Sequence, residues 1–467
     1  MKRLVWSVWL VVVGVVSSQT FAQTQAPTKI LTFEEAVKIA MQNGVLLGQQ
    51  KNNLELSQMQ RLQSVVAIGP NVSLNGSVSR FDGNSFNNNT GTVVNGVRDN
   101  VSGSINANLN LFSGFNRMNQ IKQYANALEG QAYFVTRTAQ DLINTVANQY
   151  LRVMLDVELY KIAKQNFDAL DKQLGQVKEQ VGLGSRSPVD EYNQDALTKQ
   201  AELRMVQAEI NLNNDKTLLV QTLLIDPFEQ FEVEKPNWDI NVIGSDKDMN
   251  VEELAERAKQ FRGDYLRATK QEAAQKFAMK AAWGNMLPSL YAFGTYASAY
   301  NYQHGLTDST TNSSGVKVPT QPNFEDQFKR NNVYKNYGLQ LQIPVFQGLQ
   351  NRTTRMQQEV LYKNNELTRK NLEYQIKNDV LRSVRNFEGA KKSYGVTGDG
   401  LKAAELAFSL ETERYNLGVT NFVDFTNANR VLVQAQTDRA QAEFTLVFQR
   451  ILIEYAVGTL KAEDLTR

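Results

Sequence analysis

The chain has 467 residues, of which 50 are Lys or Arg and 48 are Asp or Glu, with one histidine and no cysteine. Without an excess of basic residues there is little to neutralise nucleic-acid phosphates, which argues against DNA or RNA binding. The absence of cysteine excludes disulfides, thiolate metal sites, a cysteine nucleophile and a lipid anchor on an N-terminal cysteine.

The first residues have the pattern of a secretory signal. A basic start, Lys2-Arg3, precedes an apolar run over 4–16 that is too short to span a bilayer comfortably. The small residue Ala22 then predicts a cleavage site, so residues 1–22 are expected to be a signal peptide, with an N-terminal membrane anchor as the alternative. Further along, no run of about eighteen apolar residues follows, so a membrane role would require a β-barrel.

The remainder is predicted to be one unit repeated twice. The tracts 179–190 and 413–424 share Glu, Leu, Gly, Val and Asp at a separation of 424 − 190 = 234 residues. The openings of the two halves, 31–36 and 250–255, match at a separation of 219. Agreement over several tracts is improbable by chance and indicates an internal repeat. The separation of 234 also relates two shorter pairs: 111–114 with 345–348, and 207–209 with 441–443.

The first repeat, 31–225, is predicted to contain long helices and two strands. Segments such as 72–79 alternate apolar or small residues with Ser or Asn, the pattern of a barrel wall with one lipid face and one wet face. A proline-free stretch, 115–183, would form a rod on the order of 100 Å long. The expected elements are a first helix, strands at about 70–82 and 100–112, a solvated loop at 82–100, a long helix 113–184 and a helix 188–225.

Spacings of three and four within the long helix predict a coiled-coil seam. The seam residues are Phe167, Leu170, Leu174, Val177 and Val181.

The second repeat, 250–460, follows the same order. Prolines at 70 and 288 mark the change from helix to strand in the two halves, since proline disfavours helical geometry in the preceding residue. The expected elements are a helix, strands at about 288–300 and 333–346 around a polar loop at 301–332, a long helix 347–417 and a helix 422–458, with a linker at 226–249 and a tail at 461–467.

Four strands would leave two open edges. In hydrocarbon each unpaired backbone group costs several kcal/mol, so one chain could not close a barrel alone. A barrel therefore requires an oligomer.

Together these features resemble the TolC family of outer membrane efflux proteins. The resemblance rests on the repeat, the Leu-Gly turn tracts followed by Val-Asp, the Phe-x-Gly strand-to-helix junctions and the strand-loop-strand placement, from about Leu31 to Leu460. It implies a mainly α fold with a transmembrane β-barrel in the cell outer membrane. Three chains would form a homotrimer with a twelve-stranded barrel and a long periplasmic α-helical barrel, with the linker near a belt around the helices.

The resemblance also implies a function and partners. Such proteins are passive exit ducts in tripartite efflux or type I secretion, docked onto a periplasmic adaptor protein and an inner-membrane efflux pump or ABC transporter. No cofactor, metal or nucleic acid is implied.

In this family the two hairpin turns form the periplasmic entrance. Tyr415 matches a tyrosine whose hydrogen bonds hold the entrance shut, and Asp424 matches an aspartate in a ring of negative charge. Asp190 and Arg186, in the first turn, could supply further contacts. The pattern departs from some members at Asn427 and Thr420, where they have an aspartate and an arginine. The implied adaptor-docking tips are Leu183, Gly184, Ser185, Leu417, Gly418 and Val419.

Three of the four gate residues also have an ordinary structural interpretation. Asp424 could be a helix N-cap, and Asp190, beside Pro188, could mark an ordinary helix start. Tyr415 could be a coiled-coil residue in the seam of Leu401, Ala404 and Phe408.

Other classes of function have less support. The single histidine, His304, lies in a polar loop, and neither a phosphate loop nor a catalytic constellation is found, so no enzyme is expected. A non-conducting secreted coiled-coil scaffold or adhesin would explain the helices and the signal but not the four alternating strands. An SDS-resistant, heat-modifiable trimer would distinguish the two.

Overall fold

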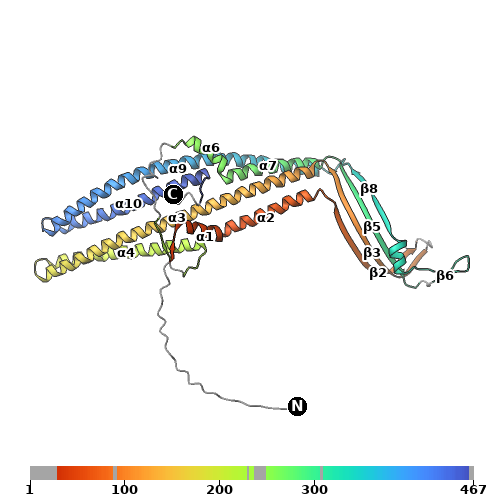
Figure 1. Ribbon diagram of the computed structural model, residues 1–467, viewed down its shortest axis with the longest axis horizontal. Coiled ribbons are helices and arrows are strands. Elements are labelled where there is room, and N and C mark those ends of the chain that lie inside the picture. Colours follow the sequence, from red (N-terminus) through yellow and green to blue (C-terminus); the bar gives the residue numbers. More distant parts are fainter. Residues whose placement is uncertain (1–28, 88–91, 229–230, 236–248, 306–308, 462–467) are drawn as a thin grey trace, which may run out of the picture.

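The computed structural model describes residues 29–87, 92–228, 231–235, 249–305 and 309–461. The predicted signal peptide and most of the predicted linker lie outside these residues. Figure 1 shows an elongated molecule, with a sheet at one end and two long helical hairpins at the other.

The helices of the two halves match one another in length. The first half has α1 (Phe33–Asn43), α2 (Val45–Val66), α3 (Asn116–Gly182) and α4 (Pro188–Leu223), and the second has α6 (Val251–Phe261), α7 (Gly263–Gly284), α9 (Gln350–Asn416) and α10 (Phe422–Val457). The paired lengths are 11, 22, 67 and 36 residues. Helices α3 and α9 start 350 − 116 = 234 residues apart, which confirms the repeat.

The offset of the two openings differs by one residue from the sequence alignment. Helices α1 and α6 start 251 − 33 = 218 residues apart, so the separation of 219 was wrong. The N-caps explain the difference, because Thr32 and Asn250 both accept hydrogen bonds from first-turn backbone N–H groups. In the sequence, Ala36 and Ala255 match at a separation of 219, and this match hid the equivalence of the two N-caps.

Four strands form one antiparallel sheet in the order β2-β3-β5-β8: β2 (Asn71–Asn87), β3 (Thr92–Ser113), β5 (Ser289–Gln303) and β8 (Tyr334–Gln342). The predicted loop at 82–100 was therefore largely wrong, because β2 and β3 stay paired as far as Asn87 and Thr92. Ladder hydrogen bonds join backbone groups, so the Asn- and Gly-rich composition did not stop the strands. Strand β8 ends before the predicted 346, near Pro344, which has no N–H to donate.

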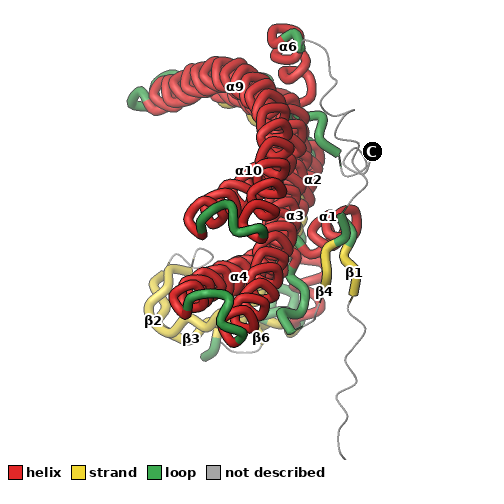
Figure 2. Tube along the Cα trace, turned by 90° about the vertical axis from the view of Figure 1, so that its left-hand side faces the viewer, coloured by secondary structure: helices red, strands yellow, loops and turns green. Residues whose placement is uncertain are grey.

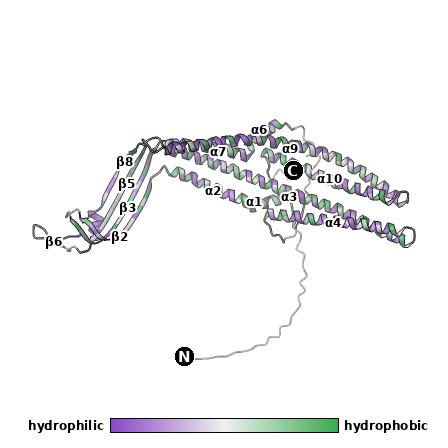
Figure 3. Ribbon diagram, turned by 180° about the vertical axis from the view of Figure 1, so that it is seen from behind, coloured by the Kyte–Doolittle hydropathy of each residue, from purple (hydrophilic) through white to green (hydrophobic). Residues whose placement is uncertain are grey.

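The two hairpins of the sheet have the same register. Asn71 pairs with Asn108 in the first, and Ser289 pairs with Gln342 in the second, which are the same positions after shifts of 218 and 234. One face carries exposed apolar side chains such as Leu74 (81% exposed), while Ser and Asn occupy the other. Figure 3 shows hydrophobic and hydrophilic residues interspersed along the strands. None of the helices in the described part is long and apolar enough to cross a membrane.

The segment between β5 and β8, predicted as a loop, contains short elements: β6 (Ser309–Thr311), β7 (Lys317–Pro319), α8 (Phe324–Asp326) and the π-helical turn η1 (Gln327–Asn331). In this segment, side-chain amides form hydrogen bonds with the backbone near the end of β5, where no strand in the described part of the chain pairs with it on that side. Gln327 accepts from the N–H of Asn301 (3.1 Å) and donates to its carbonyl (3.0 Å), and Gln321 binds Gln303 in the same way. These bonds satisfy backbone groups of β5 past Ala297, which pairs with Tyr334 at the beginning of β8.

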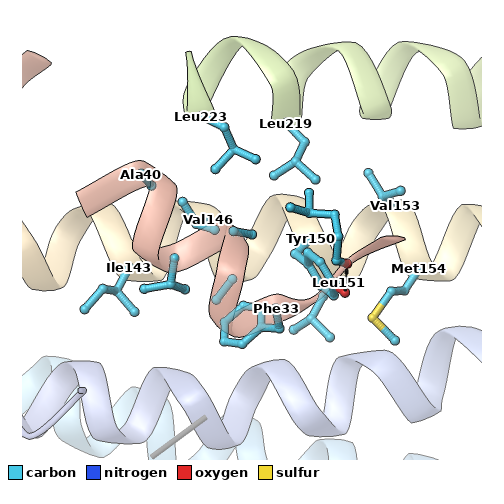
Figure 4. Packing of buried hydrophobic residues seen from close by; sticks show 14 of the residues in the cluster. Phe33, Ala40, Ile143, Val146, Tyr150, Leu151, Val153, Met154, Leu219 and Leu223 are labelled. Carbon is cyan, nitrogen blue, oxygen red and sulfur yellow. Dashed lines mark hydrogen bonds between the residues drawn. The ribbon is translucent and has the colours of Figure 1, made fainter. Parts of the chain in front are cut away.

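The main core lies where α1 packs on α3 and α4 (Figure 4). Tyr150 is fully buried there, and the single hydrogen of its hydroxyl is shared between the carbonyl oxygens of Leu31 (2.9 Å) and Glu234 (2.7 Å). These carbonyls flank a pair of short parallel strands, β1 (Lys29–Leu31) and β4 (Phe231–Val233), that the sequence did not predict. The core thus ties the start of the first repeat, at Leu31, and the described part of the linker, at Glu234, to the middle of α3.

Two carboxyl groups meet in the interface between α3 and α4. Asp156 and Asp215 are each 9% exposed, and Arg152 Nε lies 2.6 Å from Asp215 Oδ2. Burial, followed by the hydrogen bond and charge of Asp215, raises the pKa of Asp156 to about 7.

We expect this pair to make stability depend on pH. Because the native state holds the proton more tightly than the unfolded chain, stability falls as pH rises from about 4 to about 7 and then levels off. Asp156→Asn should flatten this part of the profile and raise the melting temperature at pH 8. Thermal unfolding from pH 5 to 8 checks this, with exposed Asp168→Asn as the control. An unchanged profile in Asp156→Asn would contradict it.

Candidate functional site at the hairpin tips

Both helical hairpins turn by the same backbone motif. The N–H of Gly184 bonds to the carbonyl of Val181, and that of Ser185 bonds to Gln180. This is a Schellman motif, which needs a left-handed residue just past the helix end, and Gly184 has φ +73°. The second hairpin repeats it at Gly418 (φ +72°). A Cβ at either glycine would meet no neighbour within 4 Å, so both turns are open to solvent.

The returning helices begin with side-chain caps. Ser187 is the N-cap of α4 and Asn421 is the N-cap of α10. The interpretation of Asp424 as an N-cap is therefore wrong, because it lies one turn inside, where its N–H donates to Asn421 Oδ1 (2.9 Å). Asp190 occupies the same position in α4, after Pro188, which agrees with an ordinary helix start.

Arg186 and Tyr415 come together although 229 residues separate them. Arg186 Nη1 donates to Tyr415 Oη at 2.8 Å, and the guanidinium carbon lies 4.7 Å from the centre of the ring. The contact combines a charge-assisted hydrogen bond with a cation–π interaction. It joins the first turn to the end of α9.

Tyr415 is at once a packing residue and a polar partner. Only 6% of it is exposed, and its ring stacks on Phe425 with 4.8 Å between centroids. Phe408 and Leu170 belong to the same cluster, so the coiled-coil interpretation holds for the ring. Its hydroxyl accepts the hydrogen bond from Arg186, and its ring makes the cation–π contact.

The structure does not bring Asp424 to this contact. Its carboxylate is exposed and accepts from Asn421 Nδ2 (3.0 Å) and Thr420 Oγ1 (3.3 Å), both in its own turn. A carboxylate at a helix N-terminus is favoured there by the helix dipole. Asp424 therefore presents a fixed negative charge to solvent at the tip.

The tips expose large apolar side chains. Leu183 is 85% exposed, Leu417 78% and Val419 65%. Sequence reasoning missed Tyr192 and Val423, which are 74% and 70% exposed near the starts of α4 and α10. The sequence contained a signal for these two residues, because an apolar residue beside a solvent-exposed turn has no hydrophobic core to pack into.

Metal chemistry receives no support from the described residues, which contain no group of three or more His, Cys, Asp or Glu placed to hold an ion.

Comparison with known proteins identifies the family. The profile described as Outer membrane efflux protein matches residues 36–223 and 266–459. The chain belongs to this family, as the sequence resemblance predicted. It is an outer membrane protein with a long periplasmic part.

Curated relatives are distant in sequence. Outer membrane protein TolC of Salmonella enteritidis is 21% identical over 328 residues, which cover 70% of this chain and 62% of that protein. The pyoverdine export outer membrane protein OpmQ of Pseudomonas aeruginosa is 22% identical over 375 residues, covering 79% and 72%. The match thus spans less than two thirds of the length of the TolC relative.

Solved structures confirm the fold. The CmeC outer membrane channel of Campylobacter jejuni superposes with a TM-score of 0.77 at 13% identity, covering 92% of this chain and 88% of that one. The TolC-like fold class predicted from the sequence is confirmed.

Proposed function

We propose that this protein is the outer-membrane exit duct of a tripartite efflux or type I secretion system. In this role it passively conducts substrates delivered by an inner-membrane efflux pump or ABC transporter and a periplasmic adaptor protein. The observation that carries the proposal is a sheet with an exposed apolar face, continued by long hairpins that form an arc when seen along the molecule (Figure 2). An arc of this kind encloses a passage only when further copies of the chain complete it to a ring.

The same features favour an oligomer, and the family resemblance implies that it is a homotrimer. Strands β2 and β8 each pair on one side only within the described sheet, so the chain offers two free edges. Lipid cannot satisfy the backbone groups of these edges. Three copies would supply twelve strands and close the sheet into a barrel, with the helices continuing as a periplasmic tunnel.

The hairpin tips are the proposed adaptor-docking surface. Leu183 and Leu417 project from turns that the Schellman motifs hold in one shape, and their exposure supports contact with another protein. The other docking residues proposed are Gly184, Ser185, Gly418 and Val419.

We expect loss of apolar side chains at the tips to uncouple the duct from its partner. Leu183→Asp combined with Leu417→Asp should lower export at least about tenfold, a loss of roughly 1.4 kcal/mol in docking, while leaving the amount of trimer unchanged. Export from cells and trimer on unheated SDS gels measure the two effects. Phe228→Asp makes the same change at a residue that is 91% exposed, far along the chain from the tips, and should export normally. Normal export by the double variant would exclude these leucines from docking.

The entrance is proposed to be gated by Tyr415, Arg186 and Asp424, with Asp190 nearby in the first turn. The Arg186–Tyr415 bond supports a latch between the hairpins. Threefold symmetry would bring three Asp424 carboxylates near one axis and concentrate their negative potential in a narrow opening.

Single-channel conductance of the purified protein in planar bilayers tests the duct and its charge ring. Wild type should give a small, cation-selective conductance that divalent cations added on the periplasmic side reduce. Asp424→Ala should lose this block, because the binding charge is gone. Conductance with an unchanged block would leave the duct standing and exclude Asp424. A folded trimer that never conducts would favour the coiled-coil scaffold.

A further inference from the structure

In the part of the sheet that the structure describes, the polar face bears no charge over most of its length. It is formed by alternate residues of 71–79, 100–113, 289–301 and 334–342. The one charged residue in these ranges is Lys335, which pairs with Tyr296 on the apolar face. The polar groups of the other face are therefore the hydroxyls and amides of Ser, Thr, Tyr, Asn and Gln.

Hydroxyl and amide groups on this face are bonded to one another across the strands. The hydroxyl oxygens of Ser77 and Ser102 lie 2.8 Å apart, and Thr295 Oγ1 donates to Asn106 Oδ1 at 3.0 Å. By the proposed function this face lines the lumen of the barrel. A solute on its way out therefore meets groups that donate and accept hydrogen bonds but carry no charge.

Aromatic rings occur along the same face. Tyr291 and Phe293 lie near the end of the sheet that joins the helices, as alternation along β5 requires. Further out are Tyr334 and Phe81, which are 57% and 52% exposed. Each ring offers an apolar plane beside hydrogen-bonding groups.

A polar pocket opens where the strands join the helices. Its volume is about 190 Å³, and the residues that line it include Asn285, Tyr291, Gln342, Gln347 and Asn351. Pockets for drug-sized ligands have about 300–1,000 Å³, so this one suits a single ring.

The junction holds the pocket in one shape. The backbones of Gly284 and Gly114 approach so closely that neither position admits a Cβ. Asn116 Nδ2 donates to Asn285 Oδ1 at 2.9 Å, and Asn351 Nδ2 donates to the carbonyl of Asn285 at 2.9 Å. The pocket is therefore formed before any ligand enters it.

Two donors in the pocket are available to a ligand. Gln347 is held by Asn351, whose Nδ2 donates to its Oε1. Within the described residues, the amide nitrogens of Gln342 and Gln347 have no acceptor. Together with the hydroxyl of Tyr291, they can bind the oxygens of an uncharged molecule.

The fold itself does not require this pocket, because the repeat does not preserve it. After shifts of 218 and 234, Asn285, Tyr291 and Asn351 correspond to smaller or charged residues of the first half. Those residues are Ala67, Ser73 and Arg117. The amides and the ring are thus specific to the second half.

We propose that the lumen face of the sheet is a path for an uncharged, polyhydroxylated substrate, and that the pocket is its first subsite beyond the helical tunnel. The inference rests on the proposed function and names the class of substrate. A sugar ring carries hydroxyls at its edge and C–H groups on its faces, so amides bind the edge while Tyr291 or Phe293 stacks on a face. Weak binding at several such sites lets a solute move on.

Saturation-transfer difference NMR with maltoheptaose tests this inference. The method detects weak ligands in fast exchange and shows which of their protons lie next to the protein. We would titrate this neutral oligosaccharide into the purified trimer, in a detergent whose headgroup contains no sugar. Maltoheptaose should give a saturable signal that is strongest at its ring C–H protons. Polyethylene glycol of the same mass is also uncharged but has no rings and no hydroxyls along its length, and it should give none.

Two variants in the pocket should weaken binding. Tyr291→Ala removes the stacking ring, and Gln342→Leu removes an amide at nearly constant volume. Each should raise the dissociation constant for maltoheptaose at least about fivefold, as expected for one aromatic contact or one hydrogen bond. Tyr337→Ala is the matched control, because Tyr337 lies on the apolar face and is 82% exposed. Unheated SDS gels show whether each variant forms trimer, and Gln342→Leu decides the test if Tyr291→Ala does not.

Failure of the inference differs from failure of the proposed function. A trimer that conducts ions in planar bilayers but gives no saturable signal with maltoheptaose would overturn the inference and leave the duct intact. The same holds if polyethylene glycol gives an equal signal, or if the folded pocket variants bind as Tyr337→Ala does. A protein that neither forms trimer nor conducts would remove the duct itself, and the inference with it.

Discussion

Tyr415→Phe should open the entrance while leaving the helical core packed. The variant keeps the ring that stacks on Phe425 and loses only the hydroxyl that Arg186 binds at 2.8 Å. A hydrogen bond to a charged group contributes about 1.5–3 kcal/mol. Each bond lost would shift the ratio of closed to open entrance roughly 10- to 150-fold. Single-channel recording should show a larger conductance or longer openings.

Two further variants show whether the effect belongs to the Arg186–Tyr415 bond. Arg186→Met should open the entrance at least as much as Tyr415→Phe, because it removes the cation–π contact as well as the hydrogen bond. The double variant should conduct little more than Arg186→Met, since the hydrogen bond can be lost only once. Tyr394→Phe, earlier in α9, should conduct as wild type does. If Tyr415→Phe stays closed while Asp424→Ala loses its cation block, the latch is excluded and the charge ring remains.

Arg262→Met should cause the largest loss of stability. Arg262 is 4% exposed at the junction of α6 and α7, where Nε and Nη2 bind both oxygens of Asp264 and Nη1 binds Asp379. Burial alone would raise the pKa of Asp264, but hydrogen bonds and charge from Arg262 hold it below its ordinary value. Removing one partner of a buried ion pair costs about 3–5 kcal/mol. Because both carboxylates are partly solvated, we expect about 3 kcal/mol.

The temperature at which unheated trimer dissociates on SDS gels measures this effect. Arg330→Met is the matched control, since its ion pair with Asp326 is exposed and contributes little. A fall in the dissociation temperature should therefore be confined to Arg262→Met. Equal temperatures for the two variants would show that Asp264 and Asp379 need no counter-charge.

The sequence by itself determined the features that repeat over short distances. The seam from Phe167 to Val181 and the alternation in 72–79 are periodic patterns, and each reports directly which residues share one face of an element. The repeat separation of 234 follows from short matching tracts in the two halves. The Leu-Gly turns at 184 and 418 could also be predicted, because glycine is the residue that most readily adopts the left-handed backbone conformation that ends a helix. Fold class and family followed from these local signals.

The tertiary structure decided what depends on residues far apart. The composition of 82–100 indicated a loop, and only strand pairing keeps 82–87 and 92–100 extended. No local pattern places Arg186 on Tyr415, because that contact depends on how one hairpin packs against the other. The same holds for Arg262, whose equivalent in the first half is Gly44, so the repeat gives no hint of its carboxylate partners. The periodicity of apolar side chains determines which residues share a face of a helix or strand. The element that packs against that face is determined by the folding of the whole chain.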